Sequence, residues 1–223
     1  MRTWFFRQVL VLGLCLSFYS GAQALAQPCC GPVMPNGQRL AALLDHSGVD
    51  HLWQPHIHIN WQTEAPDPAR PGWSPHVTHC SIYAASMAAR VGIYLLRPPV
   101  HGQGDLANAQ FAWLTGPGSQ RGWKEVNARS GQTLANQGYF VLAVFKNPNP
   151  SRPGHIAIIR PSEKSLALLE ADGPEEAQAG LHNNTHTTIL RGFADHKGAW
   201  LPNDTGTIRF FAHAVDWASI PTN

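Results

Sequence analysis

Cys80 and His155 are the two residues whose chemistry and local sequence point most directly to catalysis. A helical pattern begins near Thr78, which puts Cys80 in the first turn of a helix. Unpaired N–H groups and the positive end of the helix dipole favour a thiolate there. His155 follows Pro153-Gly154 and opens an apolar run typical of a strand, so its imidazole could be the base that a thiol nucleophile needs. The pair predicts nucleophilic catalysis by a cysteine.

An imidazole in such a pair needs an acceptor for its second ring N–H, and four residues could supply one. We expect a strand over residues 165–170 beside the strand of His155, which makes Glu170 the first candidate. Asp172 lies two residues further, on the same side by strand alternation, and is the reserve acceptor or a supporting group. Gln178 and Asn183 remain alternatives for this position.

Three segments together resemble the NlpC/P60 and CHAP superfamily of papain-like cysteine peptidases and amidases, many of which act on bacterial cell walls. They are Thr78-His79-Cys80-Ser81, Pro153-Gly154-His155-Ile156-Ala157-Ile158-Ile159 and Glu170-Ala171-Asp172. His155 lies 75 residues after Cys80 and Glu170 a further 15, and the likeness covers about residues 72–175. The resemblance implies a hydrolase with Cys80, His155 and Glu170 as catalytic residues. Two departures are His79, where the family commonly has Asp, and Asp172, where CHAP members usually have Asn.

The same resemblance makes His79, Asn108 and Gln110 the candidate substrate-binding residues. The alternative is a structural role, with His79 as a groove or helix-cap residue and the two amides as internal hydrogen bonders. Three tryptophans could form a sugar platform, but we assign them to the core: Trp73, Trp113 and Trp123.

The elements that must position these residues indicate an α+β protein, because helical patterns come first and strands follow, which favours an antiparallel sheet. The resemblance adds a papain-like, NlpC/P60-type fold in which the helix bearing Cys80 packs on that sheet. We expect helices over 78–91, 105–113 and 130–137, and strands over 51–62, 139–145, 155–160, 165–170, 188–191 and 207–213.

The first residues have the layout of a secretory signal peptide. Positive residues precede an apolar run over 9–18, and small residues follow, so we expect cleavage after Ala26, with Ala24 as the alternative. The run is shorter than the roughly 20 residues of a membrane span, so we expect no stable membrane insertion after cleavage. The domains are then a signal peptide (1–26), an N-terminal extension (27–70) and a papain-like domain (71–223). The protein is expected to be exported, either to the periplasm or outside the cell.

Composition excludes some classes of protein. Charged residues make up only 13% of the chain and form no basic run, so we expect no nucleic-acid partner. Cys29 and Cys30 could be oxidised with each other or with another chain, which leaves Cys80 as a candidate free thiol.

The predicted function is an exported cysteine hydrolase that cleaves an amide bond, most simply in peptidoglycan peptides, as an amidase or endopeptidase. Its partner would be peptidoglycan or another peptide substrate, any cognate inhibitor is unidentified, and no cofactor or metal is expected. One alternative is a non-catalytic exported binding module. The other is a metal-binding protein that uses His56 and His58 with His76, His79 and Cys80.

Overall fold

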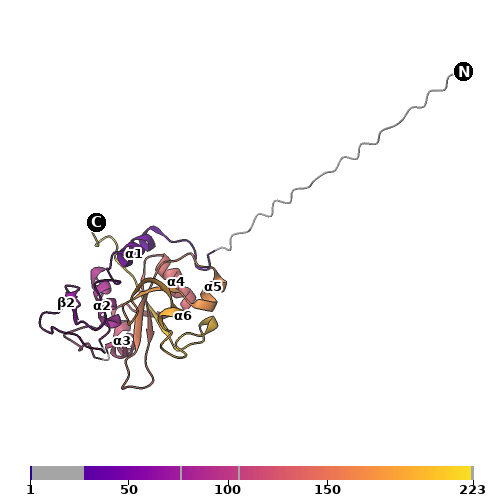
Figure 1. Cartoon of the computed structure of the whole chain (residues 1–223). Helices are drawn as coiled ribbons and strands as arrows, with labels where there is room; N and C mark the ends of the chain where they lie inside the picture. The colour runs from indigo at the N-terminus through magenta and orange to yellow at the C-terminus, as the bar shows by residue number, and fades with distance from the viewer. Residues whose placement is uncertain (2–27, 76, 105, 222–223) are drawn as a thin grey trace.

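The computed structural model describes residues 1, 28–75, 77–104 and 106–221, so the predicted signal peptide lies outside the described residues except for Met1. Its centre is a sheet with helices around it (Figure 1). The sheet has six strands in the order β3-β8-β4-β5-β6-β7, and every neighbouring pair is antiparallel. In that order the strands are Lys124–Val126, Arg209–His213, Phe140–Phe145, His155–Ile159, Glu175–Gln178 and Asn184–Thr188. The α+β prediction is therefore confirmed.

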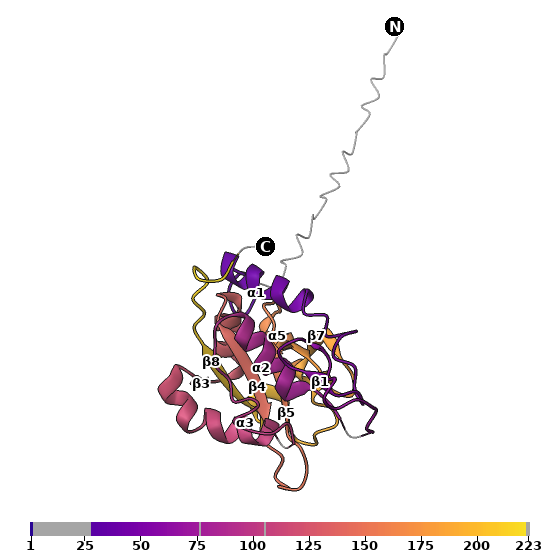
Figure 2. The same ribbon diagram turned by 90° about the vertical axis from the view of Figure 1, so that its left-hand side faces the viewer.

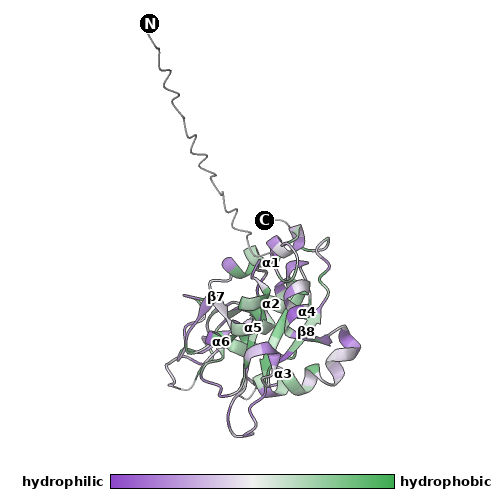
Figure 3. Cartoon of the chain, turned by 90° about the vertical axis from the view of Figure 1, so that its right-hand side faces the viewer, coloured by the Kyte–Doolittle hydropathy of each residue, from purple (hydrophilic) through white to green (hydrophobic). Residues whose placement is uncertain are grey.

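The two faces of the sheet pack into two separate apolar clusters. Leu142 and Ile158 belong to the cluster that contains Cys80, whereas Ala143 and Ala157 belong to the other. This division follows from strand geometry, because successive side chains point to opposite faces. β4 and β5 are buried along their whole length, which explains their continuous apolar sequences. The outer strand β7 is polar and carries the purple colour of hydrophilic residues in Figure 3.

Helices cover both faces of the sheet (Figure 1). α2 (Cys80–Arg90) and α3 (Leu106–Leu114) lie on the Cys80 side, and α2 crosses in front of β4 and β5 in Figure 2 and contacts β5. The opposite side carries α4 (Ala128–Asn136), α5 (Leu166–Asp172) and α6 (Ile189–Gly192). The buried body of α2 consists largely of Ala and Ser, whose small side chains let the helix approach the sheet closely. The predicted helix at Cys80 is thus confirmed.

Residues of the predicted N-terminal extension pack into the same core as the site. α1 (Pro35–Asp45) buries Leu40 and Leu44 in the Cys80 cluster, and Trp53 and Ile59 of the following turns join them. The hydroxyl of Tyr83 on α2 also donates to Ser47 at 3.1 Å. Of the strand expected over 51–62, only β1 (Ile59–Asn60) forms, and it pairs with β2 (Ala65–Pro66). The rest of the segment consists mainly of turns, each of which buries a single side chain instead of an alternating row.

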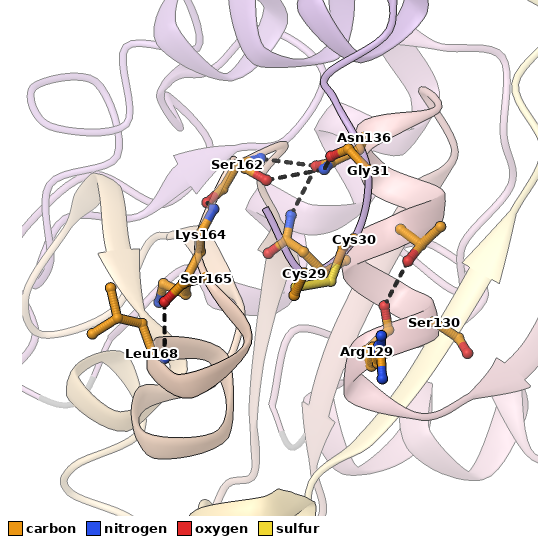
Figure 4. Close-up of a disulfide and its surroundings, with 12 residues drawn as sticks. Cys29, Cys30, Gly31, Arg129, Ser130, Asn136, Ser162, Lys164, Ser165 and Leu168 are labelled. Carbon is orange, nitrogen blue, oxygen red and sulfur yellow. Dashed lines mark hydrogen bonds between the residues drawn. A yellow bond between two sulfur atoms is a disulfide. The ribbon is translucent and has the colours of Figure 1, made fainter. Parts of the chain in front are cut away.

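Cys29 and Cys30 form a disulfide with each other, one of the two outcomes expected for them (Figure 4). The Cys29 N–H donates to the Lys164 carbonyl at 3.0 Å. The Asn136 amide donates to the carbonyls of Gly31 and Ser162, both at 2.9 Å. The disulfide segment is therefore fastened to the end of α4 and to residues 161–165. Of the described cysteines, Cys80 is free.

Two predicted strands are wrong. Residues 165–170 lie mainly in α5, because the Ser165 side chain caps the helix by accepting the Leu168 N–H, and Gly173 ends it at φ 76°. Of residues 188–191, Thr188 ends β7 and its side chain caps α6, and the other three lie in that helix. Two short 3-10 helices complete the fold, at Pro117–Arg121 and Pro202–Asp204.

Candidate active site

Cys80 begins α2 at the wall of a cavity of about 630 Å³. The residue is 6% exposed, and its sulfur lies near the backbone N–H of Ile156, which favours the thiolate. Since Ile156 directly follows His155, the sulfur lies against the first peptide of β5. Gly154, on the other side of His155, lines the same cavity. The fold thus places the start of α2, with Cys80, beside the start of β5, whereas the His155 ring packs against Phe193 of the opposite apolar cluster.

His155 is oriented by Gln178 on the neighbouring strand. Its Nε2 bonds the Oε1 atom of Gln178, and the Nε2 atom of that amide donates to the His182 carbonyl at 3.2 Å. An amide oxygen can only accept, so the imidazole proton belongs on Nε2. Nδ1 has no hydrogen-bond partner among the described residues and keeps its lone pair. This tautomer is the one that a general base requires.

The surroundings of His155 hold the ring neutral. The ring is buried against Phe193, with centroids 4.6 Å apart, and stacks on His196 at 5.4 Å. Burial lowers the pKa of His155 to about 4, with a smaller upward influence from Gln178 and a further downward one from His196. The imidazole is therefore unprotonated at neutral pH and able to accept a proton.

The thiol of Cys80 is also neutral, which corrects the expectation of a thiolate. Burial raises the pKa of Cys80, and this outweighs the hydrogen bonds from the Ile156 and Ser81 backbone, which act in the opposite direction. The helix start favours the thiolate, but desolvation of the buried sulfur has the larger effect. The resting pair is a thiol and an imidazole, so Cys80 would ionise only as His155 takes its proton.

Glu170 does not occupy the third position expected for it. It is exposed on α5 and lines a separate cavity with Asn127 and Trp200. Asp172 ends the same helix, and the hydrogen bond from His155 goes to Gln178 instead. The error has a simple cause: residues 165–170 form a helix, so the strand beside β5 is β6, which ends at Gln178. Sequence analysis kept Gln178 only as an alternative.

Asn183, the other alternative, has a structural role. Its Oδ1 accepts from the Gly180 N–H at 2.9 Å, and its Nδ2 donates to the carbonyls of Val49 and Trp53 at 2.8 Å. Asn183 therefore ties the loop after β6 to the N-terminal segment.

The three candidate substrate-binding residues line no part of the Cys80 cavity. His79 is fully buried: its Nε2 donates to the Gln54 carbonyl at 3.0 Å, and its Nδ1 accepts from Gln103 at 3.3 Å. Gln110 donates to the carbonyls of Ser81 and Leu96, which fastens the first turn of α2. The side chains of His79 and Gln110 thus make hydrogen bonds inside the protein, as the structural alternative predicted.

Asn108 fastens the loop that leads to His155. Its Oδ1 accepts from the Asn147 N–H at 3.0 Å, and its Nδ2 donates to the Arg152 carbonyl at 2.9 Å. The two bonds hold residues 147 and 152 of the loop between β4 and β5. Asn108, like Gln110, therefore holds a segment of the candidate site in place through internal hydrogen bonds.

The tryptophans divide between core and surface. Trp123 is buried and Trp113 packs against the core, as predicted. Trp73 is 68% exposed and stands beside His56, so its assignment to the core is wrong.

Residues outside the sequence motifs complete the cavity. Its polar wall includes His58, Arg70 and Gln103, and apolar residues such as Val77, Leu106 and Leu181 form much of the remainder. His58 and Arg70 come from the segment assigned to an extension. The sequence grouped His58 with Cys80 only in the alternative of a metal site, and no motif marked Arg70.

Among the residues that the structure describes, no group of three or more His, Cys, Asp or Glu side chains could hold a metal ion. His76 lies outside the described residues. Both ring nitrogens of His79 are already engaged by protein groups. Within the same described ranges, no helix has the length and apolar character to span a membrane.

Comparison with known proteins adds no relative: no protein-family model matches the chain, and no curated protein matches its sequence.

Proposed function

We propose that the protein is an exported cysteine hydrolase that cleaves an amide bond in peptidoglycan peptides. Cys80 is the nucleophile, His155 the general base and acid, and Gln178 the residue that orients His155. One observation carries the proposal: Gln178 fixes the Nε2–H tautomer of His155, and the Cys80 sulfur lies against the adjacent peptide in an open cavity. The position of the thiol, the base and the orienting amide on one helix start and two adjacent strands supports a papain-like, NlpC/P60-type architecture.

The chemistry follows from the neutral resting pair. His155 Nδ1 takes the thiol proton as the sulfur attacks the amide carbonyl carbon, and the carbonyl oxygen gains the negative charge. The Cys80 backbone N–H, at a helix start where N–H groups lack intrahelical partners, can donate to this oxyanion. The imidazolium then gives its proton to the leaving amine as the C–N bond breaks, which leaves a thioester on Cys80. Water attacks the thioester, loses its proton to His155 and restores the thiol.

Gln178 differs from a carboxylate at the same position in its effect on His155. A neutral amide fixes the ring and its tautomer without adding a charge that would strongly favour the imidazolium. The pKa of His155 therefore stays low, at about 4, and the base form persists into mildly acidic solution. An enzyme of this kind would retain activity below neutral pH.

The predicted signal peptide supports export to the periplasm or outside the cell, where peptidoglycan would be available. The proposed chemistry needs no cofactor and no metal. A non-catalytic binding module on the same fold is the second candidate, and the buried, neutral thiol is the observation that favours it.

Digestion of purified peptidoglycan by residues 27–223 tests the proposal, with the fragments analysed by mass spectrometry. We expect fragments that carry new amine and carboxylate ends, and a loss of more than about 1,000-fold in Cys80→Ser. Alkylation of Cys80 should abolish cleavage, and a chelator should not affect it. Intact peptidoglycan after prolonged incubation with folded wild type would favour the binding module, and loss of cleavage on chelation would favour a metal-dependent protein.

A further inference from the structure

Two arginine side chains pack on the ring of Tyr94. The guanidinium carbon of Arg97 lies 4.7 Å from the centroid of that ring, and the guanidinium carbon of Arg121 lies 5.2 Å from it. Arg97 also lies 4.7 Å from the centroid of Trp61, so it contacts two aromatic rings. Trp61 follows β1, Tyr94 and Arg97 connect α2 to α3, and Arg121 ends a 3-10 helix. The fold therefore assembles a pair of cations from three separate segments.

The backbone around this pair is fastened to the core. Tyr94 packs edge-on against Trp113 of α3, with ring centroids 5.6 Å apart, and its carbonyl accepts from the indole N–H of buried Trp123 at 3.0 Å. The Arg121 carbonyl accepts from the His213 ring of β8 at 2.8 Å. Stacking on an aromatic ring also restricts a guanidinium, so less conformational entropy is lost when a ligand binds to it.

Neither guanidinium is neutralised by an acidic side chain among the described residues. The described arginine ion pairs all involve other arginines. Two nearby acids in the sequence already have partners, because Glu64 bonds Arg90 and Glu125 bonds Arg209. The Nη1 atom of Arg97 is buried without an acceptor, whereas Arg97 as a whole is partly exposed and Arg121 is exposed. The exposed N–H groups of this pair would therefore gain free energy from an oxyanion.

A third cation continues the positive surface across α3. Lys146 Nζ lies 5.9 Å from the ring centroid of Phe111, and Lys146 borders a shallow cavity of about 570 Å³. Phe111 and Trp113 lie two residues apart on α3, so they point to different sides of the helix. Ala112 between them is exposed, and its small side chain leaves room for a ligand to cross the helix. Cations on both sides of α3 favour a ligand with repeated negative charges over a single small anion.

We propose that Arg97 and Arg121, with Lys146 on the other side of α3, bind a linear polymer that carries phosphate groups. A phosphate has several acceptor oxygens around one centre, so a single group can accept from both guanidiniums. The Tyr94 ring already carries two guanidiniums and is a poor platform for a base, which favours a polymer without bases over a nucleic acid. None of the three cations lines the Cys80 cavity, so this inference is independent of the proposed hydrolysis.

Binding of inorganic polyphosphate to residues 27–223, measured by isothermal titration calorimetry, tests the proposal. Arg97→Gln and Arg121→Gln should each weaken binding about tenfold, because each removes charge-assisted hydrogen bonds. Arg97→Lys keeps the charge but loses the planar donor fork, so it should bind less tightly than wild type. Arg191→Gln removes an exposed arginine from α6, on the opposite side of the sheet, and is the matched control with unchanged binding.

Wild-type affinity for polyphosphate in folded Arg97→Gln and Arg121→Gln would overturn the inference. If Arg97→Gln fails to fold, Arg121→Gln decides, since Arg121 is exposed. Polyglutamate that binds wild type as tightly as polyphosphate would overturn the assignment to phosphate. Tighter binding of single-stranded DNA than of polyphosphate would overturn it in favour of a nucleic acid. Weak binding of both competitors, with loss of polyphosphate binding in the arginine variants, is the result expected.

Discussion

Two neighbouring pairs of strands in the same sheet differ sharply in what they bury. Where β4 pairs with β8, the opposed residues in the middle are apolar, as in Leu142 with Phe211 and Ala143 with Phe210. Where β5 pairs with β6, three polar side chains are buried, which are His155, Glu176 and Gln178. Burying polar groups costs free energy unless they are hydrogen-bonded. The β4–β8 pair thus contributes mainly to stability, whereas the β5–β6 pair buries polar side chains that, in the proposed function, hold the base.

Glu176 shows the cost most clearly. Both of its carboxyl oxygens are buried without a hydrogen-bond partner, and burial raises its pKa well above the ordinary value. Glu176 and Gln178 lie two residues apart on β6, and both side chains pack against Gly192. A Cβ atom at position 192 would overlap the Glu176 carboxyl, so only glycine fits there. A buried carboxyl group with a raised pKa, and with no hydrogen-bond partner among the described residues, therefore lies near the amide that orients His155.

The largest expected effect comes from removing the base in the polar pair of strands. His155→Asn should lower amide hydrolysis by roughly 100- to 10,000-fold, because proton transfer to and from the sulfur and the leaving amine is lost. The rate of peptidoglycan cleavage measures this loss, and circular dichroism checks the fold. His46→Asn, which changes an exposed histidine on another element, should have little effect. Full activity in folded His155→Asn would contradict the role of His155.

A change in the apolar pair of strands should instead affect stability. Leu142→Ala should lower the free energy of unfolding by about 3 kcal/mol, since it leaves a cavity in a fully buried cluster. Chemical denaturation measures the loss, and the activity of the remaining folded protein should be unchanged. If Leu142→Ala lost activity but not stability, the β4–β8 pair would not differ from the β5–β6 pair in the way described above.

Substitutions at Gln178 test how the β5–β6 pair controls the tautomer and the pKa of His155. Gln178→Leu should lower turnover about tenfold, because the tautomer and orientation of His155 are no longer fixed. Gln178→Glu should raise the pKa of His155 above its value of about 4, since a carboxylate favours the imidazolium. The base form then disappears at a higher pH, so the acid limb of the pH–rate profile should move upward.

Glu170→Gln is the control for that experiment, because Glu170 is exposed and lines the other cavity. Its profile should coincide with that of wild type. A shift in Glu170→Gln with none in Gln178→Glu would restore Glu170 as the partner of His155.

Glu176→Gln should change the pH dependence of stability. The pKa of Glu176 is raised in the folded protein, so the folded state binds more protons than the unfolded state above the ordinary value of 4.5. Wild-type stability should therefore fall as the pH rises from 4.5 toward the folded pKa, by about 1.4 kcal/mol for each unit of the raised pKa that is crossed. Denaturation at several pH values should show a flatter curve for the variant. Parallel curves would mean that Glu176 is not protonated in the folded state.

The smallest effect is expected for the disulfide, which lies away from both pairs of strands. Replacing Cys29 and Cys30 with Ser should leave turnover within about threefold, because the segment is also held through Lys164 and Asn136. Steady-state kinetics of the double variant measure this. Complete inactivity in a protein that still folds would mean that Cys80 is not the sole essential thiol.

Several elements of the candidate site can be predicted from the sequence, and each wrong prediction has a physical cause. The helix at Cys80 is predicted by its helical periodicity, and the strand at His155 by a continuous apolar run that follows Pro153-Gly154. Residues 165–170 were assigned wrongly because a short apolar run fits helix or strand, and the cap at Ser165 decided for helix. That one error moved the expected partner of His155 from Gln178 to Glu170.

Other features depend on contacts between distant segments. The neutral state of Cys80 follows from its burial under the assembled fold, which a local argument from the helix start does not include. His58 and Arg70 reach the cavity because the N-terminal segment packs on the core through residues such as Trp53 and Ile59. No periodicity in residues 51–79 indicates that arrangement.

Detection of a covalent intermediate tests the central claim most directly. Residues 27–223 would be mixed with a peptidoglycan peptide, quenched in acid and mapped by mass spectrometry. The account predicts an adduct with the mass of the acyl part of the substrate on the peptide that contains Cys80, and no adduct in Cys80→Ser. Release of cleaved product without an adduct, together with full turnover by Cys80→Ser, would contradict it.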